Sequence, residues 1–568
     1  MKEKNKVIEI VKNILIVVLS ISAVLLLSFF WKDMTLEDLK SIDLSFETED
    51  DDSYQPELTL LVKPDEVTVN LGSDIYTVIN ADYSVTEVPA YLGLDEYYNK
   101  TSEAGGTTDA ATAAAPFGVS SAEQDASSAK GEEQVTYTIY DIVRAAMDKY
   151  LSMEDISLEK IEKDQYDEVM SYPSIEAAFS YGIPLSEFLE NNGIFEAESA
   201  ESVATFTTIG LSSASSENLF ICDEETGEYY RFTTGDTEVP EYMSQAIYSV
   251  ISEIDDADLP EYYTIEQLAG VKNDTLIPLY MESSMADRTY EQEFDISNER
   301  SLNKIEQAFY PSGLDFVRKI TENKGSVLYT YGYSQQVLLL DEYGSLSYSE
   351  ALDQSGYEEK GFYDALAVAV EYIKNHGGWS VIYKDGKTPY IYDVDRTSEE
   401  DGKYSGYTFD FGVILDGAPV EYGADGMLSV TVYGSQVTGY HRDVFILDDA
   451  SGALGSVGDA DAATSTGDTW VAANAINVIT DQYETICALL AEKATDEGDE
   501  EAAAAYSGED SFEEMTKRIE HIELCYINDK ENRKDVLYPA WHLRIDGANF
   551  WCDPETGAVL GYDIGEAS

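Results

Sequence analysis

Residues that commonly perform catalysis or bind metal ions are few in this chain. Histidine occurs four times among 568 residues, at His376, His441, His521 and His542. None of them lies in an HExxH motif, and no pair has the spacing by which two histidines on one helix bind the same metal ion. We therefore expect structural or surface histidines.

Nucleophile and calcium-binding patterns are equally weak. Ser157–Lys160 and Ser127–Lys130 match the Ser-x-x-Lys motif, but the SDN and KTG elements that accompany such a nucleophile are missing. Gly458–Asp461 begins like a calcium loop, yet Ala463 stands where a third oxygen ligand belongs and the closing glutamate is absent. The sequence thus predicts no catalytic residue, no cofactor and no dedicated metal site.

The four cysteines are too few to build a disulfide scaffold. They are Cys222, Cys487, Cys525 and Cys552, and no CxxC motif is present. Cys525 and Cys552 fall on strands that we expect to be neighbours, so an oxidising compartment would allow them to form a disulfide. Four unpaired thiols, buried as small apolar groups, are the alternative, and both readings stay open.

The charge of the chain excludes some partners. Lys and Arg total 35 against 110 Asp and Glu, which gives a net charge of −75. Such a surface repels nucleic acid and anionic lipid headgroups, and no basic patch offsets it. The hydrophobic content of 44% is ordinary for folded domains.

One apolar stretch without charge, Ile14–Trp31, is long enough to cross a membrane. As a helix it would span roughly 27 Å, close to the ~30 Å of a bilayer's hydrocarbon core. Lysines precede it and an acidic segment follows, which places the N-terminus in the cytoplasm. A cleaved signal peptide is the alternative, but this run is longer than usual and no A-x-A-like cleavage site follows. We expect a single-pass membrane protein with residues 1–13 in the cytoplasm and its bulk outside.

Beyond an acidic stalk at 32–55, we expect three α+β domains. Their bounds are 56–291 with a disordered insertion at 100–133, 292–441, and 442–568 with flexible insertions at 451–468 and 495–510. The last two repeat one plan, in which an amphipathic helix lies across an antiparallel sheet, because this arrangement buries both apolar faces.

Local patterns give the expected elements. In the first domain, strands are expected at 58–62, 66–71, 75–79, 204–209, 218–222 and 228–232, and helices at 138–151, 158–170, 175–190 and 240–254, with Pro184 breaking the third helix. The second domain is expected to have the order ββαβββ around a helix near 362–373, and the third a helix near 476–490 followed by strands.

Several segments, taken in order, resemble the YycH family of extracytoplasmic regulators of the sensor kinase WalK, also called YycG, in Gram-positive bacteria. They are VKNILIVVLSISAVLLLSFFW, LLVKPDEVTVNLGSDIYTVI, SVLYTYGYSQQVLLLDEYGSLSYSEAL, YTFDFGVILDGAPV and LYPAWHLRIDGANFWCDPETGAVLGY. The third domain is also similar to the sister protein YycI and, more loosely, to PepSY-type modules, with a PepSY/cystatin-like layout. The low-complexity insertions and the acidity depart from the family.

This resemblance implies a regulator without enzymatic activity that contacts the kinase through its membrane helix and outer domains. It also implies pairing with a YycI-like sister protein; a homodimer is possible. Within the span, Ser20 and Ala23 on one side, and Ser28 elsewhere, are the contact candidates. Two other hypotheses are an anchored binding module for peptides or wall fragments, and a cell-wall hydrolase.

Overall fold

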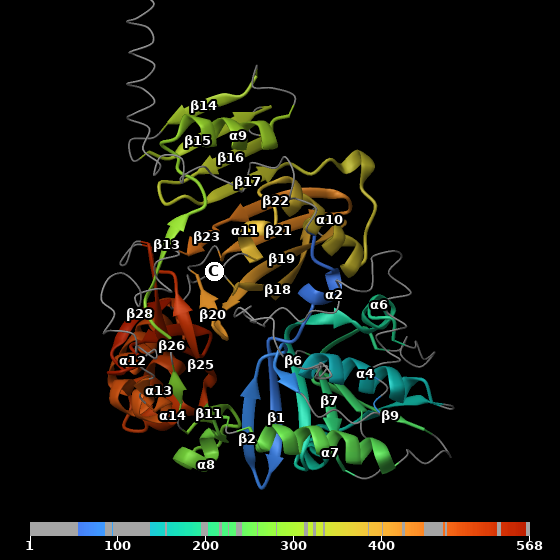
Figure 1. Ribbon diagram of the computed structural model, residues 1–568. Coiled ribbons are helices and arrows are strands. Elements are labelled where there is room, and N and C mark those ends of the chain that lie inside the picture. The colour runs from blue at the N-terminus through green and yellow to red at the C-terminus, as the bar shows by residue number, and fades with distance from the viewer. Residues whose placement is uncertain are drawn as a thin grey trace, which may run out of the picture.

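A computed structural model describes residues 55–563 apart from gaps, of which 86–136 (save Leu92 and Leu94) and 448–469 are the longest. The expected anchor at Ile14–Trp31 and the insertions at 100–133 and 451–468 lie outside the described residues. Among the residues that are described, no helix is both long and apolar enough to cross a membrane. The fold is α+β, as expected (Figure 1).

The first part of the chain builds a nine-stranded sheet with the order β11-β10-β2-β1-β6-β7-β8-β9-β5. Its strands are β1 (Glu66–Gly72), β2 (Ile75–Ile79), β5 (Ser157–Ile161), β6 (Ser174–Pro184), β7 (Thr205–Ser212), β8 (Leu219–Asp223), β9 (Glu228–Thr233), β10 (Tyr262–Thr264) and β11 (Leu276–Pro278). Helices α4 (Ile139–Leu151) and α7 (Glu241–Asp255) contribute apolar residues to the core on one face. Helix α5 (Lys163–Met170) closes a smaller cluster that includes Tyr166 and Phe220.

Three expectations in this region are wrong. Residues 58–62 contain a short helix, α2 (Leu58–Leu61), not a strand. The expected helix at 158–170 divides into β5 and α5, and the expected helix at 175–190 is strand β6 followed by α6 (Leu185–Asn191). Pro184 therefore stands at the N-cap of a helix and does not break one, which suits its missing N–H.

The middle of the chain forms antiparallel strands around α10 (Phe362–Asn375). The strand order is β14-β15-β16-β17-β22-β21-β19, with β18 on β19. Their bounds are β14 (Arg318–Thr321), β15 (Val327–Tyr331), β16 (Gln336–Leu340), β17 (Leu346–Glu350), β18 (Thr388–Glu399), β19 (Tyr404–Leu415), β21 (Leu428–Tyr433) and β22 (Gln436–Arg442). Four strands precede α10, so the expected order ββαβββ is wrong, and the long strand β18 has no counterpart among the expected strands.

The last part packs α12 (Ala475–Glu497) on β25 (Ile519–Ile527), β26 (Val536–Ile545), β27 (Ala548–Cys552) and β28 (Val559–Asp563). The stretch 495–510, expected to be a flexible insertion, instead holds the end of α12 and all of α13 (Glu500–Tyr506). Tyr506 explains the difference, because its ring is buried and its hydroxyl donates to Asp546.

The middle and last parts share one 15-stranded sheet. Strand β20 (Ala418–Glu421) pairs in parallel with β25. Strand β13 (Arg288–Gln292) pairs with both β26 and β23 (Phe445–Leu447). Figure 1 shows β13 and β20 running between the two groups of strands.

The first part contacts the middle part through β6 and α6. Ser180 Oγ donates a hydrogen bond to the Tyr392 carbonyl, and the Tyr181 ring stacks on Phe362 with centroids 6.2 Å apart. Glu187 Oε2 accepts a hydrogen bond of 3.0 Å from the Tyr363 N–H in the first turn of α10. A carboxylate at a helix N-terminus is stabilising, so one part of the chain caps a helix of the other.

Candidate functional site

Strands β25 and β26 bring a histidine and a glutamate face to face. Their antiparallel register places Glu523 directly opposite His542. Alternation along β25 puts Ile522 and Leu524 into the main core, and therefore sends His521 and Glu523 to the other face. This face holds the candidate site.

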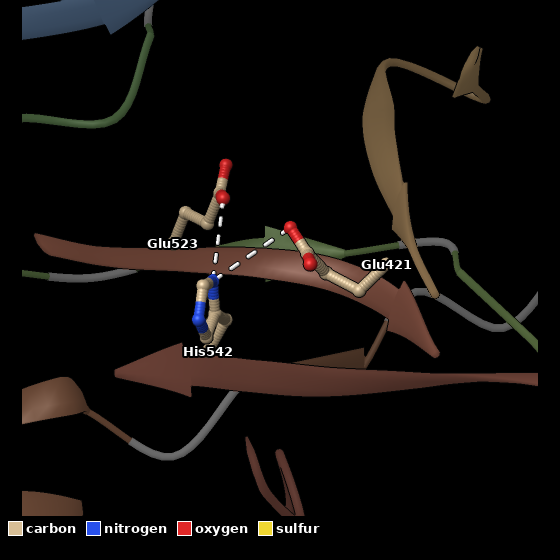
Figure 2. Close-up of side chains that lie close together, drawn as sticks. All are labelled: Glu421, Glu523 and His542. Atoms are coloured by element: carbon tan, nitrogen blue, oxygen red, sulfur yellow. Dashed lines mark ion pairs between the residues drawn. The ribbon is translucent and has the colours of Figure 1, made fainter. Parts of the chain in front are cut away.

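A third strand completes the group. A tight turn at Asp416–Gly417 reverses the chain from β19 into β20, and the parallel pairing with β25 places Glu421 beside Ile527. The His542 Nδ1 atom lies 3.6 Å from Glu523 Oε1 and 3.8 Å from Glu421 Oε1. Figure 2 shows both carboxylates directed toward the imidazole from separate strands.

His542 is held in place by its other nitrogen and by its ring face. Nε2 lies 3.0 Å from Asn549 Oδ1, and the ring stacks on Trp551 at 5.7 Å between centroids. The residue is only 9% exposed, and its buried Nδ1 makes no hydrogen bond within the described part of the chain. The contact of Nε2 with Asn549 Oδ1 fixes the orientation of the ring, and in this orientation Nδ1 faces the two carboxylates.

The electrostatics of the group are strongly coupled. Burial acts to raise the pKa of Glu523, but the neighbouring His521 and His542 imidazoles outweigh it and lower that pKa. Burial acts to lower the pKa of His521, whereas its contact with Glu523, at 3.2 Å, raises that pKa to about 9. The pKa of Glu421 is raised by burial, an effect that His542 opposes. The group therefore brings imidazoles and carboxylates together on one face of the sheet, where each shifts the pKa of the others.

The charges of this group also affect the pKa values of two carboxyl groups in the first part of the chain. Burial raises the pKa of Asp65 to about 7 against the hydrogen bonds from Ser180, and the charges of Glu66 and Glu523 contribute to the rise. Burial also raises the pKa of Glu66, which His521 lowers in turn. The group thus lies where strands from all three parts of the chain come near one another.

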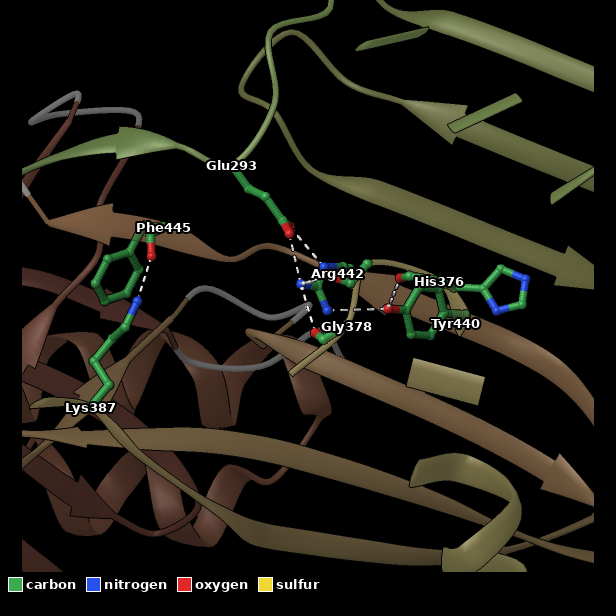
Figure 3. Close-up of polar contacts among 8 residues, drawn as sticks. Glu293, His376, Gly378, Lys387, Tyr440, Arg442 and Phe445 are labelled. Atoms are coloured by element: carbon green, nitrogen blue, oxygen red, sulfur yellow. Dashed lines mark hydrogen bonds and ion pairs between the residues drawn. The ribbon is translucent and has the colours of Figure 1, made fainter. Parts of the chain in front are cut away.

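A second polar centre, around Arg442, is buried and fully paired (Figure 3). Arg442 donates from Nε and Nη2 to the two oxygens of Glu293, each at 2.7 Å, and both side chains are completely buried. Nη2 also donates to the carbonyls of Gly377 and Gly378. Since all these groups are satisfied, this centre is structural and holds β13 against the end of α10.

The remaining residues named from the sequence have ordinary structural roles. His376 stacks on Tyr372 at 3.8 Å and bonds its carbonyl, and His441 contacts Ser347 Oγ at 3.0 Å. In the Ser-x-x-Lys sequence on β5, Ser157 bonds Thr233 and Lys160 pairs with Glu228. Ser20, Ala23, Ser28 and the sequence Gly458–Asp461 lie outside the described residues.

The four cysteines are free and buried. Cys525 lies on β25 and Cys552 on β27, and β26 separates the two strands, with Ala540 opposite Cys525 and Trp541 opposite Cys552. The two strands are therefore not neighbours, so that expectation is wrong, and the thiols of Cys525 and Cys552 are unpaired.

Sequence reasoning did not group Glu421, Glu523 and His542. The three residues come from three strands, and only the hairpin register and the parallel pairing of β20 with β25 bring them together. One local signal was available, because His521 and Glu523 alternate with the apolar residues of β25 and so mark a polar patch on an otherwise buried strand.

Comparisons with known proteins give two structural neighbours. No family model and no curated protein matches the chain. The crystal structure of YycH from Bacillus subtilis matches with 12% identity and a TM-score of 0.45, covering 87% of this chain and 97% of that one. The C-terminal domain of Bacillus megaterium YpeB matches with 10% identity and a TM-score of 0.20, covering 47% of this chain and 96% of that one. The first of these two neighbours belongs to the family that the sequence segments resemble.

Proposed function

We propose that this protein is a membrane-anchored, non-enzymatic regulator of a WalK/YycG-like sensor histidine kinase that controls cell-wall metabolism. The observation that carries the proposal is the order of the YycH-like segments, which begin with the apolar span and end in the last hairpin. The proposed localisation is the cell membrane, with the N-terminus in the cytoplasm. The proposed partners are the kinase and a YycI-like sister protein.

The architecture supports a role in protein contacts. Successive helix-on-sheet parts, joined by β13 and β20, make an extended assembly with many strand edges and faces. Edges and faces of this kind are common sites of protein recognition. In the Ser-x-x-Lys match that the structure describes, the Ser157 hydroxyl and the Lys160 amine, which could have formed a nucleophile, are engaged in sheet contacts instead.

The span is proposed to contact the kinase's own helices through small side chains. In lipid, helix association depends on close fit and on small or polar residues. We expect Ser20→Leu and Ala23→Leu to reduce co-purification of the kinase with the full-length protein. Ser22→Leu is the matched control, because position 22 is rotated about 200° from position 20 on a helix of 3.6 residues per turn.

Comparison of these three variants tests whether the span contacts the kinase or only tethers the protein. The proposal requires that the Ser20 and Ala23 variants lose kinase while the Ser22 variant, present at equal level in the membrane, keeps it. Equal recovery of the kinase with all three variants would show that the span is only a tether.

A second candidate function, binding of peptides or wall fragments, has one observation in its favour. A cavity of about 310 Å³ lies beside α9 (Glu299–Phe309), lined by Glu306, Lys319, Tyr329 and neighbouring residues. Phe316, next to this cavity in the chain, is 82% exposed. Binding of soluble wall fragments that Lys319→Ala abolishes would favour this function over kinase regulation.

The hydrolase hypothesis can also be tested at named residues. The convergent carboxylates it requires are present as Glu421 and Glu523. We expect no release of sugars or peptides from purified cell wall, and no difference between the parent protein and Glu523→Gln. Turnover that this substitution abolishes would overturn the regulator proposal.

A further inference from the structure

We propose that Glu421, Glu523 and His542 bind a divalent transition-metal ion of the zinc class, with one imidazole nitrogen and two carboxylate oxygens as ligands. The ligand atoms of the three residues all lie within 4.8 Å of one another. This inference stands independently of the proposed regulatory function, since it rests only on the geometry of β20, β25 and β26.

The separations between His542 and the two carboxylates suit a common ion. Metal–ligand bonds of about 2.0–2.2 Å in a tetrahedral site place neighbouring ligand atoms roughly 3.3–3.6 Å apart. The distances from His542 Nδ1 to the Glu523 and Glu421 oxygens are 3.6 and 3.8 Å. They exceed the usual length of an N–H···O hydrogen bond, about 2.7–3.2 Å. The two contacts are therefore ion pairs and not hydrogen bonds, and their lengths lie close to the spacing of two ligands on one ion.

The state of His542 provides a second, separate observation. Its Nδ1 is fully buried and makes no hydrogen bond among the described residues, although buried polar nitrogens nearly always find one. Its Nε2 is engaged by Asn549 Oδ1, and Trp551 stacks on the ring. A metal-binding histidine characteristically donates its other N–H to such an acceptor, which orients the ring and leaves the ligating nitrogen free.

The donor set indicates the class of ion. Ca²⁺ and Mg²⁺ prefer oxygen ligands throughout, whereas an imidazole nitrogen favours Zn²⁺, Co²⁺, Ni²⁺ and similar ions. Three protein ligands leave a fourth position for water or for a group of another molecule. Such an ion would join β20 of the middle part to β25 and β26 of the last part.

The test measures Zn²⁺ binding to the tag-free, full-length protein in detergent by calorimetry, with Co²⁺ absorption as a second readout. Millimolar Mg²⁺ is included because a chain with a net charge of −75 attracts cations unspecifically. We expect one tight site per chain, weakened at least 100-fold by Glu523→Gln or His542→Gln. Asn549→Ala should weaken it about tenfold through loss of ring orientation.

Glu520→Gln is the matched control, because Glu520 lies on the same strand but is exposed and pairs with Arg544 at 3.0 Å. It should bind Zn²⁺ within twofold of the parent protein. If His542→Gln fails to fold by circular dichroism, Glu421→Gln and Glu523→Gln carry the test. The proposal is overturned if Mg²⁺ abolishes Zn²⁺ binding, or if Glu523→Gln and Glu520→Gln bind equally well.

Discussion

At the scale of single residues, Glu293 and Arg442 show how a buried charge is tolerated in this acidic chain. Both side chains are fully buried, and two hydrogen bonds of 2.7 Å join them. Gly377 next to them has φ of 117°, and a Cβ there would lie 2.6 Å from the guanidinium carbon. The site thus admits only glycine, and it depends on both charges being present.

We expect Glu293→Gln to lower the free energy of unfolding by about 3–5 kcal/mol, because it leaves a buried guanidinium without its counter-ion. Urea denaturation checks this value. Glu359→Gln is the control, since the ion pair of Glu359 with Arg396 is largely exposed and worth less than about 1 kcal/mol. Equal losses in the two variants would contradict the structural role of the buried pair.

Asp410 offers a test by pH. Burial raises its pKa to about 6 against a hydrogen bond from Ser429, and the charges of Asp393 and Asp395 add to the rise. Because the folded state binds this proton more tightly than the unfolded state, protonation of Asp410 stabilises the fold. This stabilisation is complete below the unfolded pKa of about 3.9 and is lost as the pH rises through about 6.

Asp410→Asn should therefore be more stable than the parent protein at pH 7.5, by about 1–2 kcal/mol after allowance for solvent screening. The difference should shrink toward zero at pH 4. Denaturation at several pH values measures it, with the exposed Glu399→Gln on β18 as control. A variant that is less stable at every pH would show that the buried charge of Asp410 does not destabilise the folded protein.

At the scale of elements, the sequence predicts most hairpins and helices, and its errors have a physical cause. The helices α4, α7, α10 and α12 and the strands β1, β2, β7, β8 and β9 lie where periodicity places them. Strand β6 was mistaken for a helix because alanine and glutamate favour helices. Its buried residues nevertheless alternate with period two, at Ile175, Ala177, Phe179, Tyr181 and Ile183, and that pattern is the stronger signal.

The candidate site was beyond such reasoning. A local pattern can mark His521 and Glu523 as polar residues on a strand, but it cannot give the register that places His542 opposite Glu523. Glu421 joins the site because β20 pairs in parallel with β25, a strand far away in the sequence, and no turn motif predicts such a pairing. Contacts that depend on long-range strand pairing are set by the packing of whole sheets.

The cap that Glu187 supplies to α10 is a contact between elements of different parts of the chain. We expect Glu187→Ala to lower the free energy of unfolding by about 1 kcal/mol, since the Tyr363 N–H at the start of α10 loses its acceptor. Glu190→Ala on the same helix is the matched control, because Glu190 is exposed, and it should change stability by less than about 0.5 kcal/mol. Hydrogen exchange at the start of α10 would report the loss locally; unchanged exchange would contradict a capping role.

At the scale of the whole molecule, the three parts are held in one arrangement by specific contacts. Strand β20 of the middle part pairs with β25 of the last. The first part reaches the middle part through Ser180 on β6, which bonds the Tyr392 carbonyl on β18, and reaches the last part through Asn273, which donates to the Ile519 carbonyl. An assembly fixed in this way presents its strand edges and faces in one geometry, which the proposed role in protein binding requires.

The proposed regulator function is tested most directly by separating the outer domains from their anchor. The measurement is the level of phosphorylated response regulator in cells that carry either the full chain or a version without Met1–Trp31, exported by a cleavable signal peptide in equal amount. We predict that the full chain alters kinase output and that the unanchored version does not. Full regulation by the unanchored version, or no effect of the full chain, would contradict the account.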